Sequence, residues 1–420
     1  MKTLSALGLG LSALGWLALE LPAQGTQSRE PRAASSLQVF HVVIGQGAHY
    51  WEKYGHNMLW FFDPAAGIDV AYNWGTFDFN SADFLQRQLV GDPIYAVDTV
   101  PGQWVIQAYA RTDRTVTLQQ LNLTPVQAER ALAYSRRHML PQHRHYRYDY
   151  FRDNCATRVR DVIDFAVGGA LKRATAATRV KVTYRGETLR LLDDMPLTQF
   201  GTHVALGQPA DRLLTVWESM FIPMRMRDAL RLVRIPGAGG AATPLVAQER
   251  VFYESPTHRD RPGVPALWIP YLIIGLLLAA EFLVVATLGR RARVADVIFR
   301  VEVALFSLVA GVAGLVLVLA WTVTRHAFWF RNENLFLLNP LSLFLAALAL
   351  LSIWKPRFAR AAAITALVTA VLAAVAAVVK VIPGFTQNNI ALICLFAPAH
   401  VAIAYSLWVR REPRAESLEP

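Results

Sequence analysis

The stretch YDYFRDNCATRVRD, residues 148–161, contains one of the two cysteines of the 420-residue chain. The other, Cys394, lies inside a long apolar run, where we expect it to pack as a small hydrophobic side chain. If the first half of the chain is exported, Cys155 has no disulfide partner, and a free thiol in an oxidising compartment is a liability unless it is buried or used. A helix is predicted to begin at Cys155, and the free N–H groups and dipole of a helix N-terminus lower a thiol pKa and can hold an oxyanion. This is the position that a nucleophile requires.

A thiol nucleophile needs a base nearby to take its proton. Among the histidines outside the apolar runs, His56 is the best candidate, because KYGHNMLW places it after a glycine at the start of a predicted strand. His143 and His145 lie among arginines, where a neutral base is disfavoured. Alone, His56 would be interpreted as a structural histidine; beside Cys155 we interpret it as the base. No His, Cys and Asp residues have the spacing of metal ligands, so we expect neither a metal nor another cofactor.

Strands and a helix predicted from hydrophobic periodicity would position these two residues. LQVFHVVIG (37–45) is typical of a strand, and residues 57–75 are typical of two strands joined by a turn at 63–67. After Asn154 the apolar residues fall on one helical face until a Gly-Gly pair stops the run. The pattern therefore predicts a histidine on a strand and a cysteine at the start of a helix.

The remaining exported sequence predicts further elements. Residues 103–121 are typical of a second hairpin, and a helix is expected from Pro125, with Thr124 and Gln127 forming a capping box. Alternating tyrosines predict a half-buried strand at 146–150, RVKVTYRG predicts another at 179–186, and 212–232 is an amphipathic stretch that would lie against the membrane or the first domain.

Five long apolar runs occupy the C-terminal part of a chain that is 54% hydrophobic. Each is near the length that a helix needs to cross a bilayer: 266–289, 299–322, 335–353, 361–382 and 390–409. The segments after the first, third and fifth runs are rich in Arg and Lys, whereas the intervening loops are poor in them. Because basic loops face the cytoplasm, residues 26–265 are predicted to lie outside.

The N-terminus supports the same orientation. Residues 1–25 have one lysine, a short apolar run and then small residues, which is the pattern of a secretory signal; an uncleaved anchor helix is the alternative. We therefore predict a signal peptide (1–25), an exported domain (26–265), a transmembrane domain (266–410) and a cytoplasmic tail (411–420), in a cytoplasmic membrane. Much of the net charge of +11 lies in cytoplasmic loops, so nucleic acid is not an expected partner.

Several motifs together resemble those of a known family. A histidine at the start of a strand, followed well downstream by Asn-Cys at the start of a helix, resembles the circularly permuted branch of the NlpC-type papain-like fold. The set YGHNMLW, AYNWGTFDF and YDYFRDNCATRVRD, with NENLFLLNPL at 332–341, is similar to the Lnb-type family of bacterial envelope proteins. The resemblance covers most of the chain from 37 to 410. It implies an α+β, permuted papain-like exported domain and an all-α domain of about five transmembrane helices.

The resemblance also implies acyl transfer through a thioester, with Cys155 as the nucleophile and His56 as the base. In papain-like sites a polar side chain orients the far ring nitrogen of the histidine. The strand after the predicted turn offers Asn73 and Asp69 for this role. We favour Asn73, although strand register decides which face it occupies, and a slip of one residue would turn it to the other face.

Four further residues are candidates for substrate binding. Asn154 and Arg158 flank the nucleophile, although Asn154 could simply cap the helix and Arg158 could lie on a solvated face. Arg331 and Asn334 lie in an external loop among aromatic residues, where lipid headgroups or an ordinary aromatic belt would explain them. Glu281, in the middle of an apolar run, is a functional or helix-packing candidate without an evident partner.

Three functions fit the sequence. The first is a membrane-bound thiol acyltransferase that moves a fatty acyl chain from phospholipid to an amine, most plausibly the N-terminal cysteine of a lipoprotein. The second is an exported cysteine hydrolase that acts on peptidoglycan stem peptides or on lipid. The third is a non-enzymatic membrane assembly protein. Five membrane helices favour the first, because an enzyme that draws on phospholipid gains from a site held at the bilayer surface.

Overall fold

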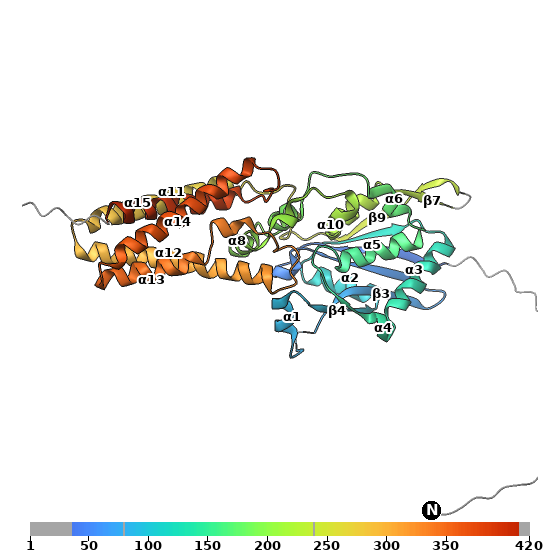
Figure 1. Ribbon diagram of the computed structural model, residues 1–420. Helices are drawn as coiled ribbons and strands as arrows, with labels where there is room; N and C mark the ends of the chain where they lie inside the picture. Colours follow the sequence, from blue (N-terminus) through green and yellow to red (C-terminus); the bar gives the residue numbers. More distant parts are fainter. Residues whose placement is uncertain (1–35, 79, 238–239, 411–420) are drawn as a thin grey trace, which may run out of the picture. The chain divides into compact units, whose positions relative to one another are not determined.

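The computed structural model describes residues 36–78, 80–237 and 240–410 (Figure 1). The predicted signal peptide (1–25) and cytoplasmic tail (411–420) lie outside these residues. Strands and helices mix in the first part, and the last part is all helical, so the predicted α+β class with a helical C-terminal domain is confirmed. The circularly permuted papain-like topology and the domain boundaries stay predictions.

Seven antiparallel strands form the central sheet in the order β6-β4-β3-β2-β1-β5-β9. The strand predicted at 37–45 is β1, and the hairpin predicted at 57–75 is β2 and β3, joined at the expected turn. The strands are β1 (Gln38–Ile44), β2 (His56–Asp63), β3 (Ile68–Thr76), β4 (Ile94–Val100), β5 (Val116–Leu121), β6 (His145–Arg147) and β9 (Val246–Tyr253), with β7 (Arg234–Pro236) and β8 (Ala242–Pro244) as a separate pair.

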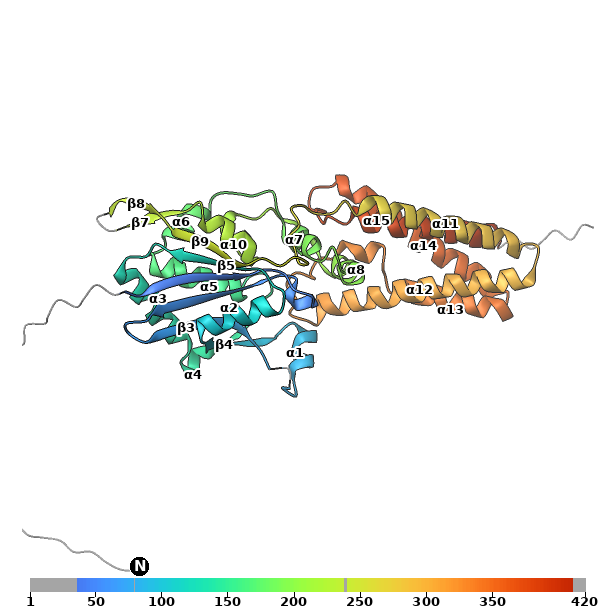
Figure 2. The ribbon, with the colours of Figure 1, turned by 180° about the vertical axis from the view of Figure 1, so that it is seen from behind.

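Helices cover both faces of this sheet (Figures 1 and 2). Apolar residues of α3 and α5 pack with Leu59 and Phe61 on one face, and Val105 of α2 packs with Met58 on the other. Burial of these side chains supplies the main stabilisation of the domain. The helices are α1 (Phe84–Val90), α2 (Gly102–Arg111), α3 (Pro125–His138), α4 (Pro141–Arg144), α5 (Cys155–Ala166), α6 (Ala170–Thr175), α7 (Tyr184–Leu191), α8 (Pro196–Ala205), α9 (Val216–Ser219) and α10 (Pro223–Leu230).

Two helix starts follow their predicted caps. Gln127 N donates to Thr124 Oγ1 over 3.3 Å and Thr124 N donates to Gln127 Oε1 over 2.9 Å, which is the reciprocal pair of a capping box. Asn154 precedes α5, and its Oδ1 accepts from Thr157 N over 2.9 Å. Cys155 is therefore the first residue of α5, as predicted.

The hairpin predicted at 103–121 is wrong in its first half. Residues Gly102–Arg111 form α2, and only Val116–Leu121 form a strand. Val105, Ile106 and Tyr109 recur at helical spacing and pack against the sheet. Apolar side chains at this spacing suit a helix, whereas a half-buried strand would need strict alternation.

Two of the three predictions for 146–232 need correction, and the third is confirmed in one of its alternatives. The strand at 146–150 is limited to β6. The strand at 179–186 is replaced by one bridge at Arg179 and by α7, because Thr183 Oγ1 accepts from Gly186 N and starts the helix. The amphipathic stretch at 212–232 is divided by Pro223 into α9 and α10, and α10 packs against β1 and α5 of the first domain.

The five predicted membrane helices are all present in the described chain. Their bounds are α11 (Trp268–Gly289), α12 (Arg293–Thr322), α13 (Leu341–Trp354, extended by the 3₁₀ turn Glu333–Phe336), α14 (Phe358–Val378) and α15 (Ile390–Val409). Glu281 of α11, which had no evident partner in sequence, lies near the carboxyl group of Glu302 on α12. Two carboxyl groups thus lie close together within the apolar layer, where ionisable side chains are rare.

Candidate active site

His56 and Asn73 face each other at the edge of the hairpin. His56 is the first residue of β2, and its Nε2 lies 2.8 Å from Asn73 Oδ1 on β3. An amide oxygen only accepts hydrogen bonds, so His56 Nε2 carries the proton and Nδ1 presents the free lone pair. The alternative, Asp69, lies four residues away, where it accepts from Trp60 Nε1 over 2.7 Å and Gly102 N over 2.9 Å.

Gly75 makes room for the His56 ring. A Cβ at this position would lie 2.7 Å from His56 Cε1 and 3.3 Å from Asn73 Oδ1. Carbon atoms do not approach so closely, so any side chain here would displace the imidazole. The AYNWG motif thus supplies both the hydrogen-bond partner of the ring and the space in which the ring lies.

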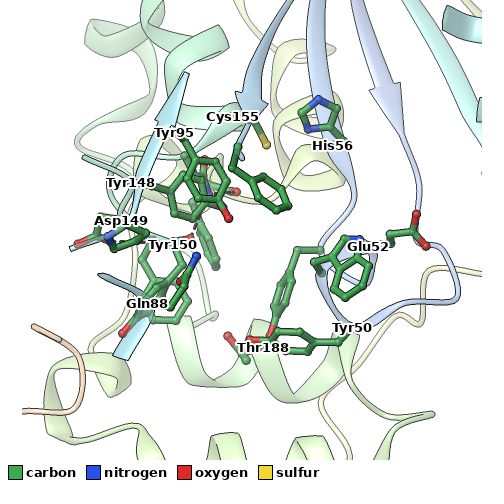
Figure 3. Close-up of a pocket in the computed structure, with 18 of the residues that line it drawn as sticks. Tyr50, Glu52, His56, Gln88, Tyr95, Tyr148, Asp149, Tyr150, Cys155 and Thr188 are labelled. Carbon is green, nitrogen blue, oxygen red and sulfur yellow. Dashed lines mark hydrogen bonds between the residues drawn. The ribbon is translucent and has the colours of Figure 1, made fainter. Parts of the chain in front are cut away.

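Cys155 lies beside His56 at one end of a cavity (Figure 3). Its side chain is buried, and the backbone N–H groups of Asn57 and Ala156 act to lower the pKa of its thiol. Asn57 follows His56 on β2, so the strand that carries the imidazole also supplies an N–H group to the thiol. Such N–H groups are placed to stabilise negative charge that develops on sulfur or on a neighbouring oxygen.

Burial sets the protonation of both groups. Burial raises the pKa of the Cys155 thiol to about 11, and it outweighs the backbone N–H groups and the positive charge of Arg114, which act in the opposite direction. The backbone N–H groups at the start of the helix do lower this pKa, as expected, but burial has the larger effect. Burial also lowers the pKa of His56 to about 4, helped by the charge of Arg114 and opposed by the Asn73 hydrogen bond. Near neutral pH the pair is a neutral thiol and a neutral imidazole, so the proton must move when the substrate is attacked.

Arg114 is a buried cation next to the pair that the sequence did not single out. It lies in the turn after α2, and its guanidinium donates to Gly45 O over 3.1 and 3.0 Å and lies 5.1 Å from the centre of the Tyr109 ring. Glu52 forms an ion pair with it at 3.4 Å. The Arg114 side chain is thus held in place before any substrate arrives.

The cavity has a volume of about 890 Å³ and extends from the Cys155–His56 pair to the membrane domain. Aromatic rings form its sides, including the stacked pair Tyr95 and Tyr148, whose centroids are 4.0 Å apart (Figure 3). At the far end it is lined by α8 and by residues 325–329, which follow α12. A space of this size, mostly apolar with a few polar groups, is suited to a ligand with a long hydrocarbon part.

Comparison with protein families now adds to this geometry. The Lnb N-terminal periplasmic domain matches residues 27–192, and the Lnb transmembrane domain matches residues 264–412. The chain belongs to the Lnb-type family. Comparison with curated proteins and with solved structures finds no match. With its five helices, this Lnb-type chain is a multi-pass protein of the inner membrane with its N-terminal domain in the periplasm, as the basic loops predicted.

The two predicted substrate-binding residues nearest the nucleophile have other partners in this Lnb-type chain. Asn154 lines the cavity, but its Nδ2 donates to Tyr150 O and Phe221 O, both over 3.0 Å, while its Oδ1 caps α5. Arg158 lies outside the cavity lining, where it pairs with Asp153 at 2.5 Å. Asn154 thus caps α5 and Arg158 forms an ion pair, and substrate binding by these two residues stays a prediction.

The loop motif NENLFLLNP fastens the two parts of the Lnb-type chain together. Asn334 is fully buried and donates to Val204 O of α8 over 2.9 Å, and Asn332 donates to Val204 O and Ala205 O over 2.9 Å each. Asn334 therefore binds the end of α8, and the structure does not bring it into the cavity. Arg331, also outside the lining, has a left-handed φ of 50° and accepts a backbone hydrogen bond from Gln208.

Sequence reasoning missed three features of the site. Arg114 was hidden in the wrongly predicted hairpin, where nothing distinguished it from the other arginines. Tyr95 was not singled out, because its partner Tyr148 lies far along the chain. Gly75 carried a usable signal, because a glycine two residues after Asn73 on an otherwise bulky strand indicates close approach of another group.

Alkylation of resting Cys155 should report its high pKa. We expect reaction with iodoacetamide to be slow near pH 7 and to rise with an apparent pKa near 11, because burial disfavours the thiolate. Mass spectrometry of the Cys155 peptide against pH measures this. Fast reaction well below pH 8.5 would contradict the neutral-pair description.

Gly75→Ala should lower the rate of the chemical step by roughly tenfold to a hundredfold, because the new methyl group displaces the His56 ring. Gly263→Ala is a matched control, since a Cβ there meets nothing within 4 Å. Single-turnover acylation of both variants, with their melting temperatures, tests this. Equal rates in the two variants would show that the ring tolerates displacement.

Arg114→Gln should move the acid limb of activity to higher pH. The positive charge of Arg114 lowers the pKa of His56, so its removal raises that pKa towards its ordinary value. Arg114→Lys keeps the charge and is the matched control, with the acid limb expected near that of the wild type. A pH profile of kcat/KM for the three proteins decides the question, and an unmoved limb in Arg114→Gln would exclude this electrostatic role.

Proposed function

We propose that this protein is a thiol acyltransferase that takes a fatty acyl chain from a membrane phospholipid and passes it to an amine, with the N-terminal cysteine of a lipoprotein as the acceptor. The observation that carries the proposal is the large cavity that joins Cys155 and His56 to the membrane domain. Its volume and aromatic walls suit a hydrocarbon chain, and its lining by residues that follow α12 supports access from the membrane.

The reaction has two halves: the acyl group is first transferred to Cys155 and then leaves it for the amine. His56 Nδ1 takes the thiol proton as sulfur attacks the ester carbonyl, and the same proton passes to the departing glycerol oxygen. The product is an acyl thioester and a lyso-lipid. In the second half the amine attacks the thioester, His56 accepts the amine proton and returns it to the leaving thiolate, and an amide forms.

The residues of the site fit these steps. Asn73 holds the ring so that Nδ1 is free to act as the base. The N–H groups at the start of α5 and the charge of Arg114 favour negative charge near the sulfur. A histidine on one strand, an asparagine on the next and a cysteine opening a helix resemble the permuted papain-like arrangement, which supports thiol chemistry on this scaffold.

The test uses the full-length protein in phospholipid vesicles with a diacylglyceryl-cysteine peptide as acceptor. We expect a new amide on the free N-terminal amine and none on the N-acetylated control peptide. Radiolabelled acyl chains in the phospholipid show whether the chain comes from it. Release of peptides from purified cell wall, without acylation of the lipopeptide, would favour the hydrolase instead. No acyl transfer and no hydrolysis would favour a binding protein.

A further inference from the structure

The short helix α1 exposes apolar residues at the mouth of the cavity. Leu85 is 68% exposed and Leu89 is 65% exposed, whereas Phe84 and Gln88 of the same helix line the cavity. Gln88 is seen below the tyrosines in Figure 3. One side of α1 therefore belongs to the cavity, and the other presents leucines away from it.

The end of α1 is attached to the periplasmic end of a membrane helix. Arg325 N donates to Val90 O over 2.8 Å, and His326 Nε2 lies 3.2 Å from Leu89 O. Helix α12 ends at Thr322, only three residues before Arg325. The leucines of α1 are thus held close to the periplasmic end of α12.

Two further contacts fix this attachment. Gly91, with a left-handed φ of 73°, packs so closely that a Cβ there would lie 2.8 Å from His326 N. Asp92 then forms ion pairs with Arg325 at 3.2 Å and Arg147 at 2.9 Å. Backbone hydrogen bonds, the close packing of Gly91 and the ion pairs of Asp92 hold α1 to the membrane domain. The position of α1 along the axis of α12 is therefore set by the fold.

The surface of α12 is apolar up to the same level. Leu319 on its last turn is 47% exposed, and Val323, directly after the helix, is 71% exposed. The exposed leucines of α1 are held close to this apolar end of α12 by the hydrogen bonds of Leu89 and Val90. Exposed leucines beside a membrane helix are stabilised by insertion among acyl chains, at about 25 cal/mol per Å² of apolar surface removed from water.

We propose that α1 is inserted in the outer leaflet of the bilayer, with Leu85 and Leu89 among the acyl chains, and that it forms the edge of the entrance through which a lipid chain reaches the cavity. The entry step rests on the proposed acyl transfer, whereas the membrane insertion of α1 does not. In this arrangement the donor chain passes from the leaflet past Phe84 and Gln88 towards Cys155 without crossing water.

The insertion of α1 in the membrane is tested by fluorescence quenching in the full-length chain. Leu85→Cys, Leu89→Cys and the control Val126→Cys are labelled with bimane in a Cys155→Ser/Cys394→Ala background and reconstituted in phosphatidylcholine vesicles that contain nitroxide-labelled lipid. Val126 is 67% exposed on α3, a helix that packs on α5. We expect severalfold stronger quenching at 85 and 89 than at 126. Equal quenching at all three positions would overturn the proposal.

The entry step is tested with two donors. In an otherwise wild-type chain, Leu85→Glu/Leu89→Glu should slow acylation of Cys155 by vesicle phospholipid at least roughly tenfold, while acylation by a water-soluble short-chain ester changes less than twofold. Equal slowing with both donors would overturn the entry role. If the wild-type chain is acylated by neither donor but quenching is stronger at 85 and 89 than at 126, the membrane insertion of α1 is supported and the acyl transfer is refuted.

Discussion

Cys155→Ala is expected to abolish acyl transfer, with a loss of at least roughly 10⁴-fold in kcat. Without the sulfur no thioester can form, and an alanine side chain has no other nucleophilic atom. The fold should survive, because α5 is capped by Asn154 and Thr157 and not by the thiol. Turnover of the lipopeptide acceptor by full-length protein in vesicles measures the loss, and thermal unfolding reports the fold.

The second cysteine of the chain provides the matched control. Cys394 lies in α15, and Cys394→Ala should keep activity within about twofold, because the conservative loss of a small apolar group costs little there. Retention of more than about one hundredth of wild-type activity in Cys155→Ala would contradict nucleophilic catalysis by Cys155.

His56→Ala should lower the rate of acylation by roughly 10²- to 10⁴-fold, because the neutral thiol then has no base.

The pH dependence of the wild-type rate should also reflect the titration of His56. Since the pKa of His56 is lowered to about 4, the imidazole stays neutral and active as pH falls through 6, and activity is lost only as pH approaches that value. Single-turnover acylation across pH, in wild type and variant, tests both statements.

Substitution of Asn73 tests whether this residue orients the His56 ring without taking part in proton transfer. Asn73→Ala should lower the rate by about tenfold or more, because Nε2 loses its acceptor and the ring its fixed orientation. In the His56→Ala background the same change should have little further effect, since no ring remains to be oriented. Full additivity of the two losses would contradict the role of Asn73 as the partner of His56.

The sequence predicted the parts of the fold that have a strong local signal. The capped start of α5 and the hairpin β2–β3 follow from cap residues and from turn chemistry, and five apolar runs became five helices. The prediction for residues 103–121 failed because the helical spacing of Val105, Ile106 and Tyr109 was interpreted as that of a strand.

The sequence predicted which residues form the candidate site better than it predicted the burial and the partners of those residues. The choice between Asn73 and Asp69 depended on strand register, and the structure pairs Met58 with Asn73 and Phe62 with Asp69. The high pKa of Cys155 could not be foreseen, because desolvation depends on what covers the thiol. Likewise Asn334 has its partner on α8, far away in sequence, so no local pattern revealed it.

The most direct test of this account is the mass of the intact full-length chain after incubation with phospholipid and no acceptor. We predict an increase of one fatty acyl group that hydroxylamine removes, present in wild type and absent in Cys155→Ser and His56→Ala. A Cys155→Ser chain that carries the same hydroxylamine-labile group, or a wild-type chain that consumes the donor without ever carrying the acyl group, would contradict a thioester on Cys155.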